Sequence, residues 1–442
     1  MESVAFLTDM YEYSMLSDAL SDGSAFRRCV FEVYTRSLGG GRRYGVFAGL
    51  GRLLSSLKDL RPTGRDLEFL LSKKIISQKA AEWLENFRFT GTLKSYMEGD
   101  MYFPLSPVMQ VEASYAEGLL LETLSLSILN YDSAIASAAC RMSNVNPKRP
   151  CYEMGSRRMN EWAAVAAARA AIVGGFEGTS NMEAGMLYGI PLIGTSAHNF
   201  TLVHDSEKQA FEVQYKNNKD ATFLVDTFDV KKAIASAVKI AGPSLKGVRI
   251  DSGDLGSLAR EVRAELDALG AGNAKITVTG DLDEYALLSL NSAPVDACGI
   301  GTRLVTGSGL PTSQMVYKLV EREDKNGKMQ PVWKKSAGKN SYPYAKSVFR
   351  LVEDGKYEKE IVVMGSPEGK EKWQKAHAEK ERLVPMLHTV AEGGEPKEGL
   401  CGKEGLLTAR ERCREELKKF PEKILSLSPG EPVIETQMVR AH

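Results

Sequence analysis

Four stretches between residues 222 and 304 decide the fold: TFLVDTFD (222–229), GVRIDSGDLG (247–256), KITVTGD (275–281) and DACGIGTRL (296–304). Each contains a short run of apolar, often β-branched residues and ends in a cluster of Gly, Asp, Thr or Arg. A fifth stretch of this kind, IPLIGTSAHNF (190–200), precedes them. Apolar runs of this length are typical of buried parallel strands, and the polar clusters mark their carboxyl ends.

The segments between these runs are long enough to return the chain through a helix, as parallel strands require. One of them, LGSLAREVRAELDALG (255–270), places its Leu and Val residues at helical spacing and ends in glycine. This pattern predicts an amphipathic helix with a C-terminal stop. Strands that alternate with helices indicate the α/β class, and we expect an irregular TIM-like α/β barrel over residues 113–310. The loops after the strands carry the chemistry in such folds, so the polar clusters are the predicted active site.

Two regions flank the predicted barrel. Residues 1–112 combine an N-terminal helix, a strand-like alternation and a predicted β-hairpin at 91–104, which indicates an α+β domain. Residues 311–442 contain Asn-Gly and Asp-Gly turns (326–327 and 354–355) between alternating runs, followed by charged helices. The turns predict β-hairpins. We expect these hairpins and helices to pack back on the N-terminal domain.

Composition excludes several classes of protein. Among 442 residues, 57 Lys and Arg balance 57 Asp and Glu, which argues against broad binding to nucleic acid or to an anionic membrane. Six cysteines without a CxxC pair favour a reduced, cytoplasmic protein without a structural zinc site. The N-terminus lacks signal-peptide features, and no run reaches the ~18 apolar residues of a membrane helix. We therefore expect a soluble intracellular protein.

The polar clusters carry groups suited to phosphate chemistry. They include carboxylates at Asp226 and Asp251, a cation at Arg249, and glycine turns at Gly280 and Gly301. Glycine turns that open a helix expose N–H groups to phosphate, and carboxylates opposite a phosphate suit Mg²⁺. A guanidinium is suited to a diphosphate or a carboxylate.

Four other residues each admit two interpretations. His198 is one of five histidines; a lone histidine is usually structural, but its strand-end position favours catalysis. Tyr11, in the first turn of the predicted N-terminal helix, is either a packing aromatic or a ligand contact. Arg157 is either solvated or ligand-bound. Ser180 precedes Glu183 at the spacing of a capping box, which predicts an N-cap, and contact with a ligand is compatible with that role.

The order of the motifs resembles a known family. The chain contains, in this order, TDMYE (8–12), LLLETLSLSILNYDSAIASAACRM (119–142), EMGSRR (153–158), GFEGTSNMEAG (175–185), GTSAH (194–198), VDTFD (225–229), VRIDSGDL (248–255), VTGDLDEY (278–285) and GIGTRL (299–304). This series resembles nicotinate phosphoribosyltransferases, which are related to nicotinamide phosphoribosyltransferase within the type II phosphoribosyltransferases. The resemblance extends to about residue 350. It implies transfer of a phosphoribosyl group from phosphoribosyl diphosphate to nicotinate, which gives nicotinate mononucleotide and diphosphate for NAD biosynthesis by salvage.

The resemblance also implies a phosphohistidine, because His198 matches a histidine that ATP phosphorylates in this family. Asp226 and Asp251 match acidic residues around the ribose and Mg²⁺, with Asp251 acting on the metal through the substrate. Thr195 and Arg249 match residues that contact nicotinate or its ribosyl donor.

Other implied roles concern the base and the 5′-phosphate. Arg157 matches an arginine near both, and Gly280, Gly301 and Thr302 match the 5′-phosphate loops. Tyr11 matches an aromatic that stacks on the pyridine ring from the neighbouring subunit of a homodimer. Ser180 stands where nicotinamide-specific relatives have aspartate, which favours nicotinate as the base.

Two departures from the family pattern stand out: residues 343–346 read Pro-Tyr-Ala-Lys where Pro-Gly-x-Lys is usual, and Cys401 and Cys413 do not reproduce the zinc knuckle of some members. Neither touches the central motifs. The same transfer to nicotinamide or quinolinate is one alternative. A barrel that binds a sugar phosphate without catalysis is the other.

Overall fold

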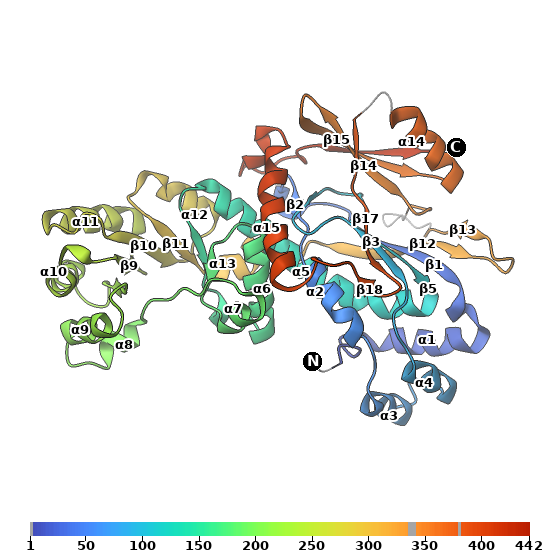
Figure 1. Ribbon diagram of the computed structural model, residues 1–442, viewed down its shortest axis with the longest axis horizontal. Helices are drawn as coiled ribbons and strands as arrows, with labels where there is room; N and C mark the ends of the chain where they lie inside the picture. The colour runs from blue at the N-terminus through green and yellow to red at the C-terminus, as the bar shows by residue number, and fades with distance from the viewer. Residues whose placement is uncertain (1–2, 335–341, 379–381) are drawn as a thin grey trace. The chain divides into compact units, whose positions relative to one another are not determined.

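The computed structural model describes residues 3–334, 342–378 and 382–442. The chain divides into two compact units (Figure 1). The split unit comprises residues 1–137 and 310–442, and the continuous unit comprises residues 138–309. The boundary expected between residues 112 and 113 falls inside the split unit. Helix α5 (Tyr115–Val145) starts there, and only its last turns belong to the continuous unit.

The continuous unit is built on a six-stranded parallel sheet with the strand order β7-β6-β11-β10-β9-β8. Its strands are β6 (Cys151–Glu153), β7 (Gly178–Thr179), β8 (Thr222–Leu224), β9 (Gly247–Ile250), β10 (Lys275–Gly280) and β11 (Ala297–Ile300). The four runs that open the sequence analysis therefore form strands. Their apolar side chains, such as Val248 and Val278, are fully buried.

This sheet is open, so the expected irregular TIM-like α/β barrel is not confirmed. All of residues 138–309 are described, and within them no pairing joins the edge strands β7 and β8. These edge strands have only 2 and 3 residues. The stretch 190–200, predicted as a strand, contributes a single bridge between Thr179 and Leu192. The α/β class is confirmed, but too little strand is present at the edges to close the sheet.

Helices connect these strands: α6 (Glu161–Val173), α7 (Met182–Tyr188), α8 (His198–Leu202), α9 (Glu207–Asn217), α10 (Val230–Ala241), α11 (Leu255–Ala268) and α12 (Glu284–Ser289). Helix α13 (Thr302–Val305) follows the last strand. Helix α11 follows the predicted periodicity, since Val262 and Leu266 are buried and Gly270 adopts φ +78° just beyond its end. Asp254 caps α11 and Asp229 caps α10, each accepting a backbone N–H at 2.9 Å. These two strand-end carboxylates therefore serve as helix caps.

The split unit contains a seven-stranded sheet, in the order β13-β12-β1-β5-β3-β17-β18, that joins both ends of the chain. Its strands are β1 (Arg28–Thr35), β3 (Thr92–Ser95), β5 (Met109–Ser114), β12 (Met315–Glu323), β13 (Met329–Pro331), β17 (His388–Glu392) and β18 (Glu395–Pro396). Strand β1 is antiparallel to both β5 and β12. The C-terminal segment thus contributes strands beside the N-terminal ones.

The hairpin predicted at 91–104 is wrong. Strand β3 pairs with β5 and β17, whereas β4 (Met101–Tyr102) pairs with β2 (Gly45–Val46) in a separate sheet. Backbone hydrogen bonds of 2.8 Å join Phe47 to Gly99 and to Asp100, and they carry the chain to this other partner. The two C-terminal hairpins are confirmed: β12 pairs with β13, and β14 (Ser347–Glu353) with β15 (Lys356–Met364).

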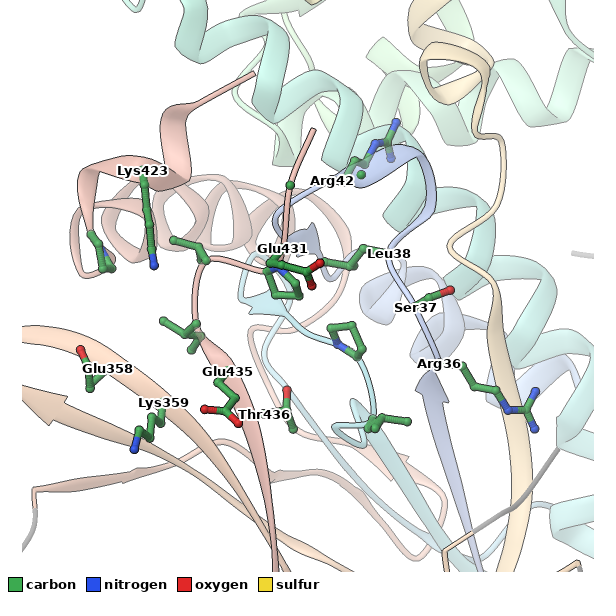
Figure 2. A pocket seen from close by; sticks show the side chains of 18 residues that line it. Arg36, Ser37, Leu38, Arg42, Glu358, Lys359, Lys423, Glu431, Glu435 and Thr436 are labelled. Carbon is green, nitrogen blue, oxygen red and sulfur yellow. The ribbon is translucent and has the colours of Figure 1, made fainter. Parts of the chain in front are cut away.

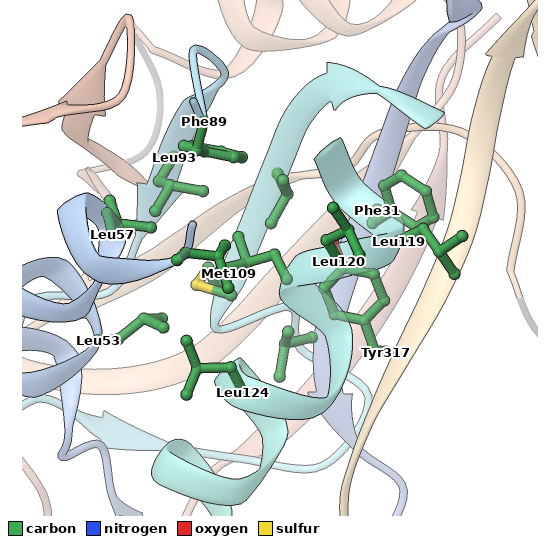
Figure 3. Packing of buried hydrophobic residues seen from close by; sticks show 14 of the residues in the cluster. Phe31, Leu53, Leu57, Phe89, Leu93, Met109, Leu119, Leu120, Leu124 and Tyr317 are labelled. Carbon is green, nitrogen blue, oxygen red and sulfur yellow. The ribbon is translucent and has the colours of Figure 1, made fainter. Parts of the chain in front are cut away.

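Helix α5 packs on the seven-stranded sheet and forms the main core of the split unit. Figure 3 shows Leu119, Leu120 and Leu124 of this helix beside Phe31 and Tyr317 of the sheet. The Phe31 and Tyr317 ring centroids lie 5.0 Å apart. The Tyr317 hydroxyl donates to the backbone carbonyl of Gly118 in α5 at 2.8 Å. Burial of these large side chains supplies the main stabilisation of the unit.

A second sheet of the split unit has the order β16-β14-β15-β19, with β16 (Leu383–Pro385) and β19 (Glu435–Arg440) at its edges. The fully buried Arg350 of β14 pairs with Glu360 and Glu416, each at 3.0 Å. The remaining helices are α1 (Met10–Asp22), α2 (Leu50–Ser56), α3 (Gly64–Ser72), α4 (Gln78–Glu85), α14 (Pro367–Ala378) and α15 (Gly402–Lys418). Across the described residues, no helix combines the length and the apolar character that a membrane crossing demands.

Candidate active site

A cavity of about 550 Å³ lies at the carboxyl edge of the parallel sheet in the continuous unit. Loops that follow β6, β7, β10 and β11 line it, together with β9 and the segment 194–197. Eight of the predicted site residues line this cavity: Arg157, Ser180, Thr195, Arg249, Asp251, Gly280, Gly301 and Thr302. Parallel strands bring their following loops to one edge, which explains why residues far apart in the sequence meet here.

The split unit has a larger cavity, of about 850 Å³, that contains none of the predicted site residues. Figure 2 shows side chains of both charges around it, with Glu358 and Lys359 on β15 and Glu435 on β19. Prolines and aliphatic residues complete the lining. Its opposite charges do not converge on one ligand chemistry, so the smaller cavity is the better candidate.

Arg249 is the most connected cation in the candidate site. Its Nε donates to the Thr279 hydroxyl at 2.8 Å, and its Nη1 donates to the Thr195 hydroxyl at 2.9 Å and to the Ser196 carbonyl at 3.3 Å. Its Nη2 donates to Oδ1 of Asp251 at 2.6 Å. Partners on three segments therefore hold the guanidinium in one orientation at the cavity wall.

Two carboxylates lie side by side at the ends of β8 and β9. Oδ2 of Asp226 accepts hydrogen bonds from the Asp251 N–H at 2.9 Å and the Ser252 hydroxyl at 2.7 Å. Oδ1 of Asp226 is buried without a hydrogen-bond partner. Partial burial raises the pKa of Asp251, but hydrogen bonds from Thr279 and Arg249 outweigh it, so this pKa lies below its ordinary value. Asp251 is therefore ionised at neutral pH.

His198 faces both carboxylates. Its Nδ1 lies 3.1 Å from the Thr227 hydroxyl, and its Nε2 lies 4.0 Å from Oδ1 of Asp226 and 3.8 Å from Oδ2 of Asp251. The side chain is 40% exposed. A histidine in a packing role is normally buried, so this position favours the catalytic interpretation over the structural one.

Glycines allow the loops to approach one another closely. A Cβ at Gly299 would lie 2.5 Å from the Met154 sulfur, and one at Gly301 would lie 3.3 Å from the Met154 carbonyl. Gly280, the last residue of β10, adopts φ +155°, and Thr302 begins α13. The predicted phosphate loops therefore lie beside the loop that carries Arg157.

The N-cap predicted at Ser180 is wrong, because α7 begins one residue later. Asn181 is the N-cap, and its side chain accepts the Ala184 N–H at 2.9 Å. Asn181 also donates from Nδ2 to the Ser156 hydroxyl at 2.9 Å. The Ser180 side chain is exposed and lines the cavity, so capping does not occupy its hydroxyl.

Tyr11 belongs to the split unit. Its ring is 47% exposed on α1, whereas Tyr13 on the same helix is only 2% exposed. The packing interpretation therefore applies to Tyr13 and not to Tyr11. Asp9 holds the N-cap position of α1 without a side-chain hydrogen bond to the helix.

Sequence reasoning missed two buried residues that organise the site, Thr279 and Glu153. The Thr279 hydroxyl bonds both Arg249 and Asp251, and the residue is 3% exposed. Glu153 bonds the loops after β6 and β7 and is fully buried. Both lie inside quoted motifs, Glu153 at the last position of β6 and Thr279 at the next-to-last position of β10. A polar residue at the end of a buried strand indicates a candidate site residue. Its hydrogen-bond partners, however, depend on which strands are neighbours in the sheet, and the sequence does not give that order.

An open parallel α/β sheet that gathers arginines, carboxylates and glycine turns at its carboxyl edge defines a class of proteins that bind phosphorylated ligands there. The sequence model of the nicotinate phosphoribosyltransferase N-terminal domain matches residues 6–130, and that of the nicotinate phosphoribosyltransferase family matches residues 150–365. The chain belongs to the nicotinate phosphoribosyltransferase family.

Individual relatives agree with this assignment. The chain is 44% identical over 450 residues to nicotinate phosphoribosyltransferase pncB1 of Mycobacterium tuberculosis, covering 100% of this chain and 96% of the relative. It is 36% identical to a Bacillus subtilis nicotinate phosphoribosyltransferase, over 81% of this chain and 75% of the relative. The fold is similar to that of human nicotinic acid phosphoribosyltransferase, with a TM-score of 0.78, 23% identity and 98% coverage of both chains.

Proposed function

We propose that this protein is a nicotinate phosphoribosyltransferase of NAD salvage. It transfers the phosphoribosyl group of phosphoribosyl diphosphate to nicotinate and releases nicotinate mononucleotide and diphosphate. Membership of the family supports the reaction. The observation that carries the proposal is the cavity in which Arg249 and Asp251 meet the glycine loops at 280 and 301.

In this reaction the bond between the ribosyl C1 and the diphosphate oxygen breaks, and a bond from C1 to the pyridine nitrogen forms. The ring nitrogen supplies the electron pair, and the diphosphate leaves with the pair of the broken bond, so no proton transfer is needed. Arg249 and Arg157 offset the charge of the anions, and Gly280, Gly301 and Thr302 hold the 5′-phosphate. Catalysis is then mainly positioning and electrostatic stabilisation.

The residues at the ends of β8 and β9 fit Mg²⁺. Oδ1 of Asp226 is buried without a hydrogen-bond partner, and both it and Oδ2 of Asp251 lie about 4 Å from one histidine nitrogen. Among the described residues, no three His, Cys, Asp or Glu side chains form a metal-binding group. Mg²⁺ commonly relies on one or two carboxylates, substrate oxygens and water. When bound, it neutralises the charge of the diphosphate.

ATP is the proposed second substrate, and His198 is the proposed phosphoryl acceptor. Thr227 occupies Nδ1, which leaves Nε2 to attack the γ-phosphorus of ATP. A P–N bond forms, the bond to the bridging oxygen breaks, and ADP leaves. The phosphoryl group adds negative charge beside Asp226 and Asp251 and so changes the electrostatics of the site. Its later hydrolysis removes that charge, which couples ATP consumption to nucleotide formation.

We further propose a cytoplasmic homodimer in which Tyr11 of one subunit stacks on the base bound by the other. The family resemblance and the exposed Tyr11 ring support this arrangement. Neutral net charge supports small-molecule substrates rather than nucleic acid or membrane as partners.

The direct test measures mononucleotide and diphosphate formation from nicotinate, nicotinamide and quinolinate, each with and without ATP. The proposal expects nicotinate to be the preferred base and ATP to stimulate its use. Preference for nicotinamide or quinolinate would show that the base is not nicotinate and that the alternative transfer applies. A sugar-phosphate sensor would release no diphosphate and would leave His198 unlabelled by radioactive ATP.

A further inference from the structure

Glu153 is a fully buried carboxylate to which the proposed reaction assigns no role. It is the last residue of β6, an interior strand between the edge strand β7 and β11. In the sheet register it pairs with Thr179 of β7 and with Ile300 of β11. Its side chain does not line the cavity, so it does not touch a ligand there.

Glu153 bonds both loops that carry the proposed base-site residues. Oε1 accepts the Gly155 N–H, and Oε2 accepts the Thr179 hydroxyl. Its backbone carbonyl accepts the Ser180 N–H at 2.9 Å. Gly155 is the N-cap of the short turn Ser156–Arg158, which contains Arg157. One residue therefore holds the loop of the arginine and the loop of the serine.

A second connection closes these contacts into a ring. The Thr179 hydroxyl accepts the Asn181 N–H at 2.9 Å, and Asn181 Nδ2 donates to the Ser156 hydroxyl at 2.9 Å. The ring therefore runs from Glu153 through Gly155, Ser156, Asn181 and Thr179 and back to Glu153. Glu153 and Thr179 in this ring are fully buried, whereas Ser156 lines the cavity.

We propose that Glu153 is a positioning residue that sets the distance between Arg157 and Ser180 on the side of the cavity that binds the base. This inference rests on the proposed function, because it takes Arg157 and Ser180 to lie beside the bound nicotinate. A buried carboxylate without its donors is strongly unfavourable, as are buried donors without an acceptor. The two loops therefore keep one relative placement as long as the carboxylate bonds both. Binding groups that move by about 1 Å lose much of their effect on a ligand.

Thr179→Val tests the bridge without removing the carboxylate. Valine keeps the shape of threonine on a strand but gives neither the hydrogen bond to Oε2 nor the acceptor for Asn181. We expect KM for nicotinate to rise about tenfold, the factor given by loss of one buried hydrogen bond. KM for phosphoribosyl diphosphate is expected to rise less than KM for nicotinate, because the glycine loops that hold its 5′-phosphate follow β10 and β11 and do not bond Glu153. Thr179→Ser restores the hydroxyl and is expected to restore KM.

Glu153→Gln provides a second variant. Its amide oxygen can accept from Gly155, but its NH₂ group then faces the Thr179 hydroxyl, which must reverse its hydrogen bond. We expect a rise in KM for nicotinate that is smaller than that of Thr179→Val. Ser143→Ala is the matched control, since it removes a hydroxyl that donates to the Gly174 carbonyl at 2.7 Å in the same unit. Neither KM should change in this control.

Hydrogen exchange separates this inference from the proposed function. Thr179→Val is expected to speed exchange about tenfold in both 154–158 and 179–182, because the loops open together. Faster exchange in neither loop, or a KM for nicotinate unchanged in an active enzyme, would overturn the inference. A fall in Tm with both KM values raised alike would also overturn it, since that pattern indicates a general structural role. Wild-type protein that does not use nicotinate would instead overturn the proposed function.

Discussion

The Nη2 of Arg249 lies 2.6 Å from Oδ1 of Asp251, and the two residues share one strand end. Arg249 is 14% exposed in its side chain and Asp251 is 33% exposed. Arg249 uses the remaining directions of its guanidinium on Thr279, Thr195 and the Ser196 carbonyl. It therefore acts as an oriented positive charge in the cavity wall, with little freedom to follow a ligand.

Thr279→Val should release that orientation. The Thr279 hydroxyl bonds both Arg249 and Asp251, and valine has the same shape without the hydroxyl. We expect kcat/KM for nicotinate to fall about tenfold or more, as for loss of one hydrogen bond to a charged group. Steady-state kinetics checks the value, and Tm reports whether the fold is intact. Thr279→Ser should retain most of the activity; equal loss in the serine and valine variants would show that the hydroxyl is not responsible.

His198→Ala should abolish stimulation by ATP and leave some phosphoribosyl transfer. In the proposed mechanism, the charge added by phosphorylation lies beside Asp226 and Asp251, whereas formation of the C–N bond needs no proton from His198. The measurement compares nucleotide formation with and without ATP. His204→Ala is the control, because the Nδ1 of His204 bonds the Phe200 carbonyl at 2.7 Å within its own segment. Complete loss of activity in folded His198→Ala protein would indicate a direct acid or base role.

Asp100 should make the split unit less stable as pH rises. Burial raises the pKa of Asp100 to about 7 despite the nearby Arg350. The folded protein then binds more protons than the unfolded chain between pH ~4 and ~7. The stability that the protonated carboxyl contributes is present below this range and is lost as pH rises through it.

Asp100→Asn removes this dependence because the amide stays neutral and can still accept the Met97 N–H, which bonds Asp100 at 2.8 Å. Calorimetry at pH 5 and pH 8 should show the variant gaining at least about 3 °C in Tm relative to wild type at the higher pH. The exposed Asp18 offers the control Asp18→Asn. A constant difference between variant and wild type across this range would contradict the prediction.

Tyr11 should act on the active site of the partner subunit. Tyr11→Ala removes the aromatic and Arg249→Ala removes the cation, so each variant alone should have low activity. A mixed dimer contains one site that lacks neither, and about a quarter of wild-type activity should return in a statistical mixture of shared sites. Activity after mixing and re-equilibration measures this, with Tyr11→Phe as an active control. Heterodimers that form without regaining activity would exclude a shared site.

Local sequence patterns predicted most strands and helices of the parallel sheet. Strand order and the contacts of buried polar residues depend on partners distant in the sequence, and they were not predicted. The period of 255–270 depends only on its own side chains, and α11 follows it. The carboxyl-edge cavity was also predictable, since parallel strands align their ends. The role of Glu153 was not, because Thr179 becomes its partner only when β7 lies beside β6. The predicted barrel was not confirmed for a similar reason, because the composition of a strand does not determine which strand pairs with its free edge.

We expect base choice to depend on position 180. Asn181 caps α7, so the Ser180 side chain is exposed at the cavity without a capping role, and Arg157 lines the same cavity. A serine hydroxyl can donate to the carboxylate of nicotinate, whereas an aspartate would repel that anion and accept from the carboxamide of nicotinamide. We therefore expect Ser180→Asp to lower kcat/KM for nicotinate at least about tenfold while use of nicotinamide holds or rises, since each 1.4 kcal/mol is a factor of ten. Ser180→Asn is the matched control: it has nearly the size of aspartate without its charge, and should retain more nicotinate activity. If both variants lose nicotinate activity equally, size rather than charge selects the base at this position.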